Sequence, residues 1–427
     1  MSMELPLEIK IPLDGGQQSL WLHSAVTYLI GENGSGKSQL LRSLKSQLEP
    51  ESHIFTGKKL KLLSAGRTGN HEGFRAIDYV NYRTNRIQYD AANFGGVRDY
   101  AELMQDEMLS GVLQNLSARV DLQVKIQECL RKIFCRRVHF NWDHGQLKVY
   151  FSSIQSSEKY ISSKEASGLM HLVVLLAVIY DDKIGLALLD EPEVSLHPQM
   201  QLFILKEIVR TSGVPQEGTN KKLYIIATHS AHMLHIAKTE DILSLVACCG
   251  YNKKILQVGK SQGELQNAGV QRMIAHFGLE YKSALFSKRP LLVEGQSDII
   301  ICNALAKRYD LPVEAAGGQL LSMTGKGQIP AVVKLFKILG KQPLVLADAD
   351  AIADDSTLAN FVAMNFTEFS SIANKDGGHA SAQEFIRNIY NKFGNLVENK
   401  WHNIERLATL HRYFKLFCRE GSNRVKR

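Results

Sequence analysis

Two sets of residues in this chain have the types and spacing that phosphate chemistry requires. Residues 31–38 read GENGSGKS, a pattern whose glycines let backbone N–H groups approach phosphate oxygens while Lys37 reaches the β- and γ-phosphates. Far along the chain, two apolar segments are each followed by a pair of acids: Glu294 and Asp298, then Asp348 and Asp350. The first set indicates a nucleotide site, and the second indicates a divalent-metal site suited to phosphodiester chemistry.

The glycine-rich loop lies in the local context that a phosphate-binding loop needs. An apolar strand predicted at 26–30 runs into the loop, and a helix predicted at 39–48 follows it, so the helix N-terminus adds a favourable partial charge. Ser38 is also expected to offer its hydroxyl to Mg²⁺. We therefore predict that the loop binds nucleotide through Asn33, Gly34, Ser35, Gly36, Lys37 and Ser38.

A second acidic motif provides groups for nucleotide hydrolysis. Residues 186–191 read LALLDE, an apolar strand ending in Asp190, expected to hold Mg²⁺, and Glu191, expected to polarise the attacking water. His229 follows the next apolar strand, at 223–227, where it could sense the γ-phosphate. A histidine at a strand end is more often structural, so its position and not its residue type supports this prediction.

The distal acids also follow predicted strands. Strand 290–293 leads to Glu294 and, after a glycine turn, to Asp298, and strand 343–347 leads to Asp348 and Asp350. Four carboxylates at neighbouring strand ends would repel one another unless cations lay among them, so Mg²⁺ or Mn²⁺ is expected there. Such ions could polarise a phosphate, activate water and stabilise the leaving oxygen.

Apolar strands alternate with helices in both halves of the chain, which predicts mainly parallel α/β sheets. We predict a nucleotide-binding domain at 1–250 with an inserted helical arm around 98–135, a connecting segment at 251–287, and a second α/β domain at 288–427. A turn signal at 143–145 predicts a β-hairpin after the arm. The C-terminal tail from Arg412 is basic and is expected either to follow a phosphate backbone or to be a disordered end.

Composition narrows the class of protein only modestly. The 427 residues carry a formal charge of +8, which favours a polyanionic partner but also suits an ordinary protein. The six cysteines show no metal-ligand or disulfide spacing, and the N-terminus has no signal-peptide pattern. No apolar run approaches the ~20 residues needed to span a bilayer. We therefore expect a cytoplasmic protein that is not inserted in a membrane.

The first half of the chain resembles a group of ABC-type ATPases. Residues 190–193 (DEPE) are followed by 195–198 (SLHP), and with the P-loop and the strand-end histidine they are similar to the RecF, SMC and OLD (overcoming lysogenization defect) ATPases. The resemblance implies that two ATP-bound heads pair head to tail, each giving a signature serine to the other's nucleotide. Ser167 and Gly168 match that serine and glycine, although Leu169-Met170 replaces the second glycine and glutamine, and Ser162-Ser163 is a competing candidate. The resemblance also implies a glutamine ligand for Mg²⁺, for which Gln88 is the best placed.

The second half resembles a TOPRIM domain, and an ATPase followed by TOPRIM is the order of the OLD-family endonucleases. The resemblance implies an ABC-type P-loop ATPase domain followed by a Rossmann-like TOPRIM domain. It further implies that Glu294 is an acid/base group or metal ligand, that Asp348 and Asp350 are metal ligands, and that Asp298 is the acid that OLD nucleases add. Lys326, in a glycine turn between the motifs, could touch phosphate. Asp354 and Asp355 are candidates for extra ligands, with a hydrated helix start as the competing interpretation.

The resemblance implies an ATP-dependent or ATP-regulated endonuclease that acts on DNA in defence against foreign DNA. ATP and Mg²⁺ are the expected cofactors, with Mn²⁺ as an alternative at the TOPRIM site. A homodimer formed through the ATPase heads, or a larger assembly, is expected, and a partner protein is left open. Two alternatives also stay open: an RNA-cleaving TOPRIM effector and a non-cleaving DNA-repair ATPase.

Overall fold

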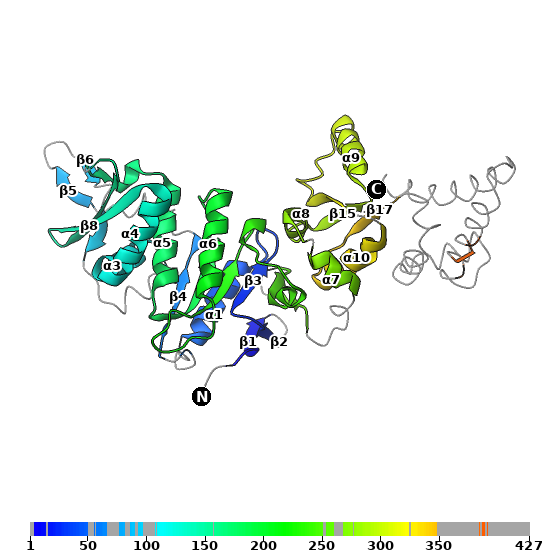
Figure 1. Ribbon diagram of the computed structural model, residues 1–427, viewed down its shortest axis with the longest axis horizontal. Helices are drawn as coiled ribbons and strands as arrows, with labels where there is room; N and C mark the ends of the chain where they lie inside the picture. The colour runs from blue at the N-terminus through cyan, green and yellow to red at the C-terminus, as the bar shows by residue number, and fades with distance from the viewer. Residues whose placement is uncertain are drawn as a thin grey trace. The chain divides into compact units, whose positions relative to one another are not determined.

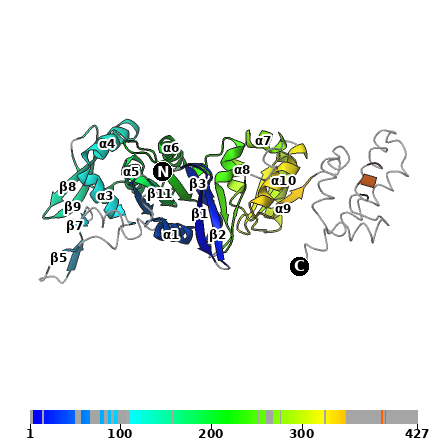
Figure 2. The same cartoon turned by 90° about the horizontal axis from the view of Figure 1, so that it is seen from below.

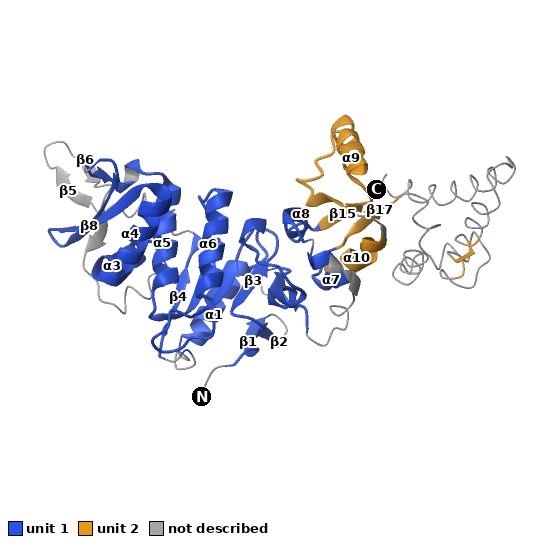
Figure 3. Ribbon diagram, in the orientation of Figure 1, with its two compact units in different colours: residues 1–288, 338–341 blue, residues 289–337, 342–427 orange. Residues whose placement is uncertain are grey.

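The computed structural model describes most of the chain up to residue 347 (Figure 1). The described ranges are 4–13, 16–49, 55, 57–65, 77–81, 86–89, 93–96, 107, 109–156, 158–250, 253–259, 268–275, 277–323 and 326–347, with 384, 387, 388 and 391 beyond them. The chain divides into two compact units, shown in different colours in Figure 3. Unit 1 comprises residues 1–288 and 338–341, and unit 2 comprises 289–337 and 342–427.

A six-stranded sheet forms the centre of unit 1, in the order β14-β13-β3-β12-β11-β4. Neighbouring strands are parallel except β13 and β14. The three middle strands are apolar and buried along their whole length, as expected for a parallel sheet covered on both faces. The strands are β3 (Val26–Ile30), β4 (Lys59–Leu63), β11 (Ile184–Asp190), β12 (Leu223–Ala227), β13 (Leu245–Cys248) and β14 (Ile255–Gln257).

Helices cover both faces of this sheet, with α1 on one side and α5 and α6 on the other (Figure 2). Helix α1 (Lys37–Leu48) presents leucines to the core, which it shares with the antiparallel pair β1 (Leu7–Leu13) and β2 (Gly16–Leu22). Helix α5 (Ser167–Tyr180) is buried at every residue from 169 to 180. Such an apolar helix is expected to be covered on all sides, and α5 lies between the sheet and the outer helices. Helix α6 (Pro198–Thr211) packs beside it.

The arm predicted at 98–135 is represented in the described residues by two helices, α3 (Leu109–Ala118) and α4 (Val120–Phe134). They are separated at Arg119, whose backbone leaves the helical region (φ −108°, ψ 87°). The predicted hairpin is confirmed: β8 (Arg136–Asp143) and β9 (Gln146–Ser153) pair in antiparallel register. The other strands of this part are β5 (Ile77–Asn81), β6 (Arg86–Tyr89), β7 (Asn93–Gly96) and β10 (Tyr160–Ile161).

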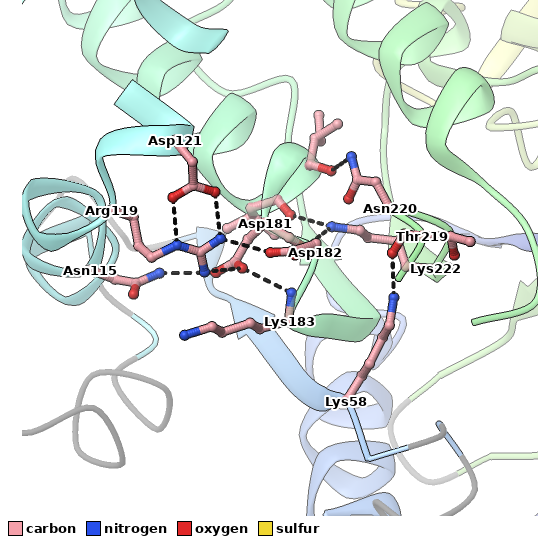
Figure 4. A network of polar contacts seen from close by, with 12 residues as sticks. Lys58, Asn115, Arg119, Asp121, Asp181, Asp182, Lys183, Thr219, Asn220 and Lys222 are labelled. Atoms are coloured by element: carbon pink, nitrogen blue, oxygen red, sulfur yellow. Dashed lines mark hydrogen bonds and ion pairs between the residues drawn. The ribbon is translucent and has the colours of Figure 1, made fainter. Parts of the chain in front are cut away.

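A polar network joins the arm to the base of the sheet (Figure 4). The Arg119 guanidinium contacts three carboxylates, those of Asp121, Asp181 and Asp182, at 2.7, 3.2 and 2.7 Å. Buried Lys222 donates from Nζ to the carbonyl oxygens of Val178 and Asp181, at 2.9 and 2.6 Å. The first bond satisfies a carbonyl group in the last turn of α5, and the second satisfies the carbonyl group of its C-cap residue.

Unit 2 contains a parallel three-stranded sheet in the order β16-β15-β17. Its strands are β15 (Arg289–Val293), β16 (Gly318–Ser322) and β17 (Leu344–Leu346), with helices α9 (Gln296–Arg308) and α10 (Ile329–Ile338). The predicted α/β class is thus confirmed in both units. The segment predicted as a connection at 251–287 contains β14, α7 (Ala268–Ala275) and α8 (Leu279–Ala284), and it falls within unit 1.

Short 3-10 turns complete the described structure at Ser162–Lys164, Ala231–Met233, Thr239–Ser244 and Lys326–Gln328. A search of the described residues finds no helix with the length and apolar character needed to cross a membrane. The basic tail from Arg412, together with Asp354 and Asp355, lies outside the described residues.

Candidate nucleotide and metal sites

The glycine-rich loop leaves the carboxyl end of β3 and turns directly into α1. A Cβ added at Gly31 would lie 2.6 Å from the Cys248 carbonyl oxygen and 2.6 Å from Ser35 Oγ, so no larger residue fits without a shift of the backbone. Gly34 and Gly36 have left-handed backbones, with φ of 75° and 87°. The loop therefore holds the compact form that brings backbone N–H groups to one anion site.

Lys37 is nearly buried, with 5% exposure, at the first residue of α1. Its ammonium nitrogen lies 3.1 Å from the carbonyl oxygen of Gly31 and 3.0 Å from that of Glu32, and thus points back across the loop. Burial lowers the pKa of Lys37, and the acids that follow β11 oppose this change. A phosphate bound at this position would replace carbonyl dipoles with full negative charge around the ammonium group.

Ser38 and Asp190 meet at the carboxyl edge of the sheet, although 152 residues separate them in the sequence. Ser38 Oγ donates to Asp190 Oδ1 at 3.0 Å. Burial raises the pKa of Asp190, and the bond from Ser38 lowers it in part. The hydroxyl and carboxylate oxygens are donors that suit Mg²⁺, and a cation there would favour the ionised form of Asp190. The residues present therefore fit the predicted magnesium site.

Glu191 and His229 lie on adjacent strand ends, because β11 and β12 are neighbours in the sheet. Glu191 has a left-handed backbone (φ 46°), unusual for a residue with a long side chain, and its N–H donates to the Ala227 carbonyl at 2.8 Å. His229 Nε2 lies 3.5 Å from Glu191 Oε1. Burial lowers the pKa of His229, Lys37 lowers it further, and Asp190 opposes this change. The strained backbone and the paired side chains are typical of a functional site.

A cavity of about 300 Å³ adjoins the start of α1. Polar groups from Gln39, Ser43 and Lys253 line it together with apolar side chains from Leu13 and Ile255. Ser35 and Gly36 of the loop form part of the same wall. The cavity therefore continues from the phosphate-binding loop and has the mixed lining that a nucleoside needs.

The proposed signature residues begin α5. Ser167 is exposed, and a Cβ on Gly168 would lie 2.5 Å from the Ser195 carbonyl oxygen. This close approach explains a glycine at 168 and packs the start of α5 against the segment that follows Glu191. Of the competing pair, Ser162 is buried, and the side chain of Ser163 lies outside the described part of the structure.

Gln88 lies in β6, which pairs with β5 in a two-stranded sheet separate from the P-loop sheet. Its side chain is outside the described part of the structure. Its role as a magnesium ligand stays a prediction.

In unit 2, Glu294 directly follows β15, and β15 pairs with β17 so that Val293 lies opposite Leu346. The carboxyl ends of these strands therefore meet at one edge, with Glu294 level with Ala347, the last described residue before Asp348. Asp298 lies in the first turn of α9, where Oδ2 accepts the Gly295 N–H at 2.9 Å.

Residues 285–350 match the family described as "Overcoming lysogenization defect protein-like, TOPRIM domain". This range includes the four predicted acids, Glu294, Asp298, Asp348 and Asp350. The chain carries an OLD-like TOPRIM domain. Within this TOPRIM domain the structure describes residues 285–323 and 326–347, which include the parallel strands β16-β15-β17, the helices α9 and α10, and the two acids of the first motif.

Asp348 and Asp350 lie outside the described residues, as does the side chain of Lys326. Among the residues that the structure does describe, no three His, Cys, Asp or Glu side chains form a metal-binding group. The described part of the TOPRIM domain thus contributes Glu294 and Asp298, whose carboxylate oxygens suit Mg²⁺ or Mn²⁺.

Curated relatives match at low identity. Endonuclease GajA from Bacillus cereus (strain VD045) is 24% identical over 262 residues, which cover 60% of this chain and 40% of that protein. The OLD nuclease from Thermus scotoductus is 25% identical over 172 residues, 40% of this chain and 31% of that protein. The matched residues thus span about two fifths or less of the length of these relatives.

Two solved structures of SMC heads match the chain at low scores. One, a head bound to the C-winged helix domain of ScpA, is 12% identical with a TM-score of 0.34, over 60% of this chain and 99% of that one. The SMC head from Thermotoga maritima is 15% identical with a TM-score of 0.32, over 59% of this chain and 99% of that one.

Sequence reasoning did not single out Glu193 or Gln201, which the structure places beside the nucleotide site. In the sequence, Glu193 is only the last residue of the DEPE motif at 190–193, and Gln201 belongs to no motif. Their contacts join segments that are far apart in the sequence, so no local signal could have identified them.

Proposed function

We propose that this chain is an ATP-regulated, divalent-metal-dependent endonuclease whose preferred substrate is DNA. The observation that carries the proposal is the coexistence of two parts in one chain: a strand-edge nucleotide site in unit 1, and an OLD-like TOPRIM domain with four acids in its motifs. TOPRIM acids serve phosphodiester chemistry through bound metal, and the upstream site would control when that chemistry occurs.

In the nucleotide site, the loop of residues 31–38 binds the phosphates, and the cavity beside α1 takes the nucleoside. Ser38 and Asp190 hold Mg²⁺, which supplies charge neutralisation on the phosphate oxygens when bound. Glu191 orients and polarises the attacking water, and His229 contacts the γ-phosphate from the adjacent strand end. The mixed lining of the cavity supports nucleotide binding by this unit.

In the TOPRIM domain, Glu294, Asp298, Asp348 and Asp350 hold the metal and handle proton transfer at the scissile phosphate. Asp298 already caps α9, so its carboxylate is fixed at the N-terminus of the helix close to Glu294. The names of the relatives, an endonuclease and an OLD nuclease, agree with cleavage as the reaction.

Two heads paired head to tail would form the active assembly, with the exposed Ser167 of one copy offered to the nucleotide of the other. The proposal also includes a cytoplasmic defence role against foreign DNA, which the OLD-like TOPRIM domain supports. Assembly, a partner protein and the defence role belong to this proposal.

Cleavage of supercoiled plasmid tests the proposal. Purified protein is incubated with Mg²⁺ or Mn²⁺, with and without ATP, beside Asp348→Ala and Lys37→Ala. Matched controls are Glu314→Ala, an exposed acid of unit 2, and Lys132→Ala, an exposed lysine paired with Glu128 on α4. Nicking that is lost in Asp348→Ala, retained in both controls and altered in its ATP response by Lys37→Ala is the expected result.

Two results would contradict this function. Nicking that persists in Asp348→Ala would show that the TOPRIM acids do not form the cleavage site. An absence of nicking, combined with metal-dependent cleavage of RNA that Asp348→Ala abolishes, would replace DNA with RNA as the substrate.

A further inference from the structure

Glu193 lies two residues beyond Glu191, in the turn that follows β11. The Val194 N–H donates to the Glu191 carbonyl at 3.1 Å, and the Leu196 N–H donates to the Glu193 carbonyl at 3.0 Å. Pro192, between the two acids, is buried. The turn therefore fixes the spacing between the two glutamate side chains.

The two glutamates hold His229 at two points. Glu193 Oε1 accepts the backbone N–H of His229 at 2.6 Å, while Glu191 Oε1 lies 3.5 Å from the imidazole Nε2 of the same residue. One contact is a hydrogen bond to the backbone of His229, and the other places a carboxylate oxygen beside its ring. A shift of either glutamate would change where the imidazole lies.

The surroundings of Glu193 make this contact strong and specific. Its second oxygen, Oε2, is buried. Burial raises the pKa of the Glu193 carboxyl, and the bond from the His229 N–H opposes that change. A buried carboxyl group is costly to retain for packing alone, so a role in the site explains it better.

A second bridge ties the same two strand ends together. Gln201 on α6 donates from Nε2 to the Leu196 carbonyl at 2.8 Å and accepts from the Ser230 hydroxyl at 2.5 Å. The turn after β11 and the turn after β12 are thus joined at His229 and, through Gln201, at the next residue, Ser230. This arrangement favours a rigid site over two independent loops.

We propose that Glu193 is a positioning residue of the nucleotide site, which holds the backbone of His229 so that the imidazole faces Glu191 and the nucleotide. The inference rests on the proposed ATPase activity. Glu193 does not touch the reacting atoms and acts through His229.

The test compares Glu193→Ala with Glu193→Gln. The alanine variant loses the acceptor for the His229 N–H, whereas the glutamine variant retains a side-chain oxygen at the same place. Glu207→Ala is the matched control, because Glu207 is a largely buried acid that bonds to the Tyr180 hydroxyl and Arg210 on α6, away from the site.

ATP turnover is the first readout. In Glu193→Ala, kcat falls about 10- to 100-fold with KM within about twofold of the wild type, as expected when a catalytic group is misplaced by a fraction of an ångström. Glu193→Gln recovers at least a third of the lost rate, and Glu207→Ala lowers thermal stability without changing kcat. An alanine variant with wild-type kcat, or a glutamine variant as slow as the alanine variant, would overturn the inference.

The second readout does not depend on activity. The ring of His229 faces Glu191, Lys37 and Asp190. Histidine-selective ¹⁵N NMR titration follows this residue, and its signal is assigned by its loss in His229→Asn. In Glu193→Ala the imidazole becomes more exposed, and its pKa rises from the lowered wild-type value toward the ordinary value. An unchanged titration would also overturn the inference. If the wild type hydrolyses no ATP, the proposed function fails, and the titration still decides the role of Glu193.

Discussion

Ser38 Oγ donates a hydrogen bond of 3.0 Å to Asp190 Oδ1 and so joins the first turn of α1 to the end of β11. Ser38 directly follows Lys37 of the P-loop. The pair predicts that the two residues act together on one cation.

Removal of the Ser38 hydroxyl should weaken Mg²⁺-dependent nucleotide binding. In Ser38→Ala we expect ATP affinity in Mg²⁺ to fall about tenfold, since one oxygen ligand is lost, while affinity in EDTA changes little. Fluorescent-nucleotide titration with and without Mg²⁺ measures both. Ser46→Ala serves as the control, because Ser46 is an exposed serine on the same helix whose hydroxyl donates to the Arg42 carbonyl. Equal losses in both buffers would argue against a metal role for Ser38.

Gly168→Ala should destabilise unit 1. The added methyl group would lie 2.5 Å from the backbone oxygen of Ser195, which cannot move without its turn, so a loss of about 1–3 kcal/mol in the free energy of unfolding is expected. Denaturant unfolding measures it, with Ser167→Ala, at the exposed neighbouring position, as the control. A Gly168→Ala protein as stable as this control would show that the turn is pliable.

Lys222 should make stability depend on pH. Burial lowers its pKa from 10.5 to about 7, so the unfolded chain binds the extra proton between these values. The free energy of unfolding therefore rises as pH increases from 7 toward 10.5, with a slope of at most about 1.4 kcal/mol per pH unit from this group. The cost of protonating Lys222 in the folded state is fully present below pH 7.

Urea unfolding at several pH values between 7 and 10 measures the slope contributed by Lys222. Lys222→Met should remove this component, although it also leaves the carbonyls of Val178 and Asp181 without their donor. Lys221→Met is the matched control, because the adjacent lysine is exposed and should leave the slope intact. The same slope in all three proteins would mean that Lys222 remains charged when folded.

The two roles expected of Asp298, as a helix cap and as a metal ligand, can be tested separately. Asp298→Asn retains an oxygen for the Gly295 N–H, so thermal stability should be kept, whereas Asp298→Ala should lose about 1 kcal/mol. If Asp298 also holds metal, both variants lose metal-dependent nicking. If Asp298→Asn keeps both its stability and its nicking activity while Asp298→Ala loses both, Asp298 acts only as a helix cap and not as a metal ligand.

The predictable parts of this protein are those with a local signal. The P-loop is defined by glycines that are close in sequence, and the strand-to-helix change around it follows from adjacent apolar residues. The apolar strand ending in Asp190 and the hairpin at 143–145 are local in the same sense, and the structure contains both. The TOPRIM domain was also recognisable, because its two acidic motifs follow apolar strands in a fixed order.

The amino-acid sequence by itself determined which residues are the candidates for phosphate and metal chemistry, because residue type and short spacing identify such candidates. The tertiary structure alone decided that β12 lies between β3 and β11, which brings His229 beside Glu191 and the glycine-rich loop. It also decided the bond between Glu193 and His229, 36 residues apart, and the burial of Lys222 beneath α5. Such contacts arise from strand order and side-chain packing, which depend on the whole fold and leave no periodic or local trace in the sequence.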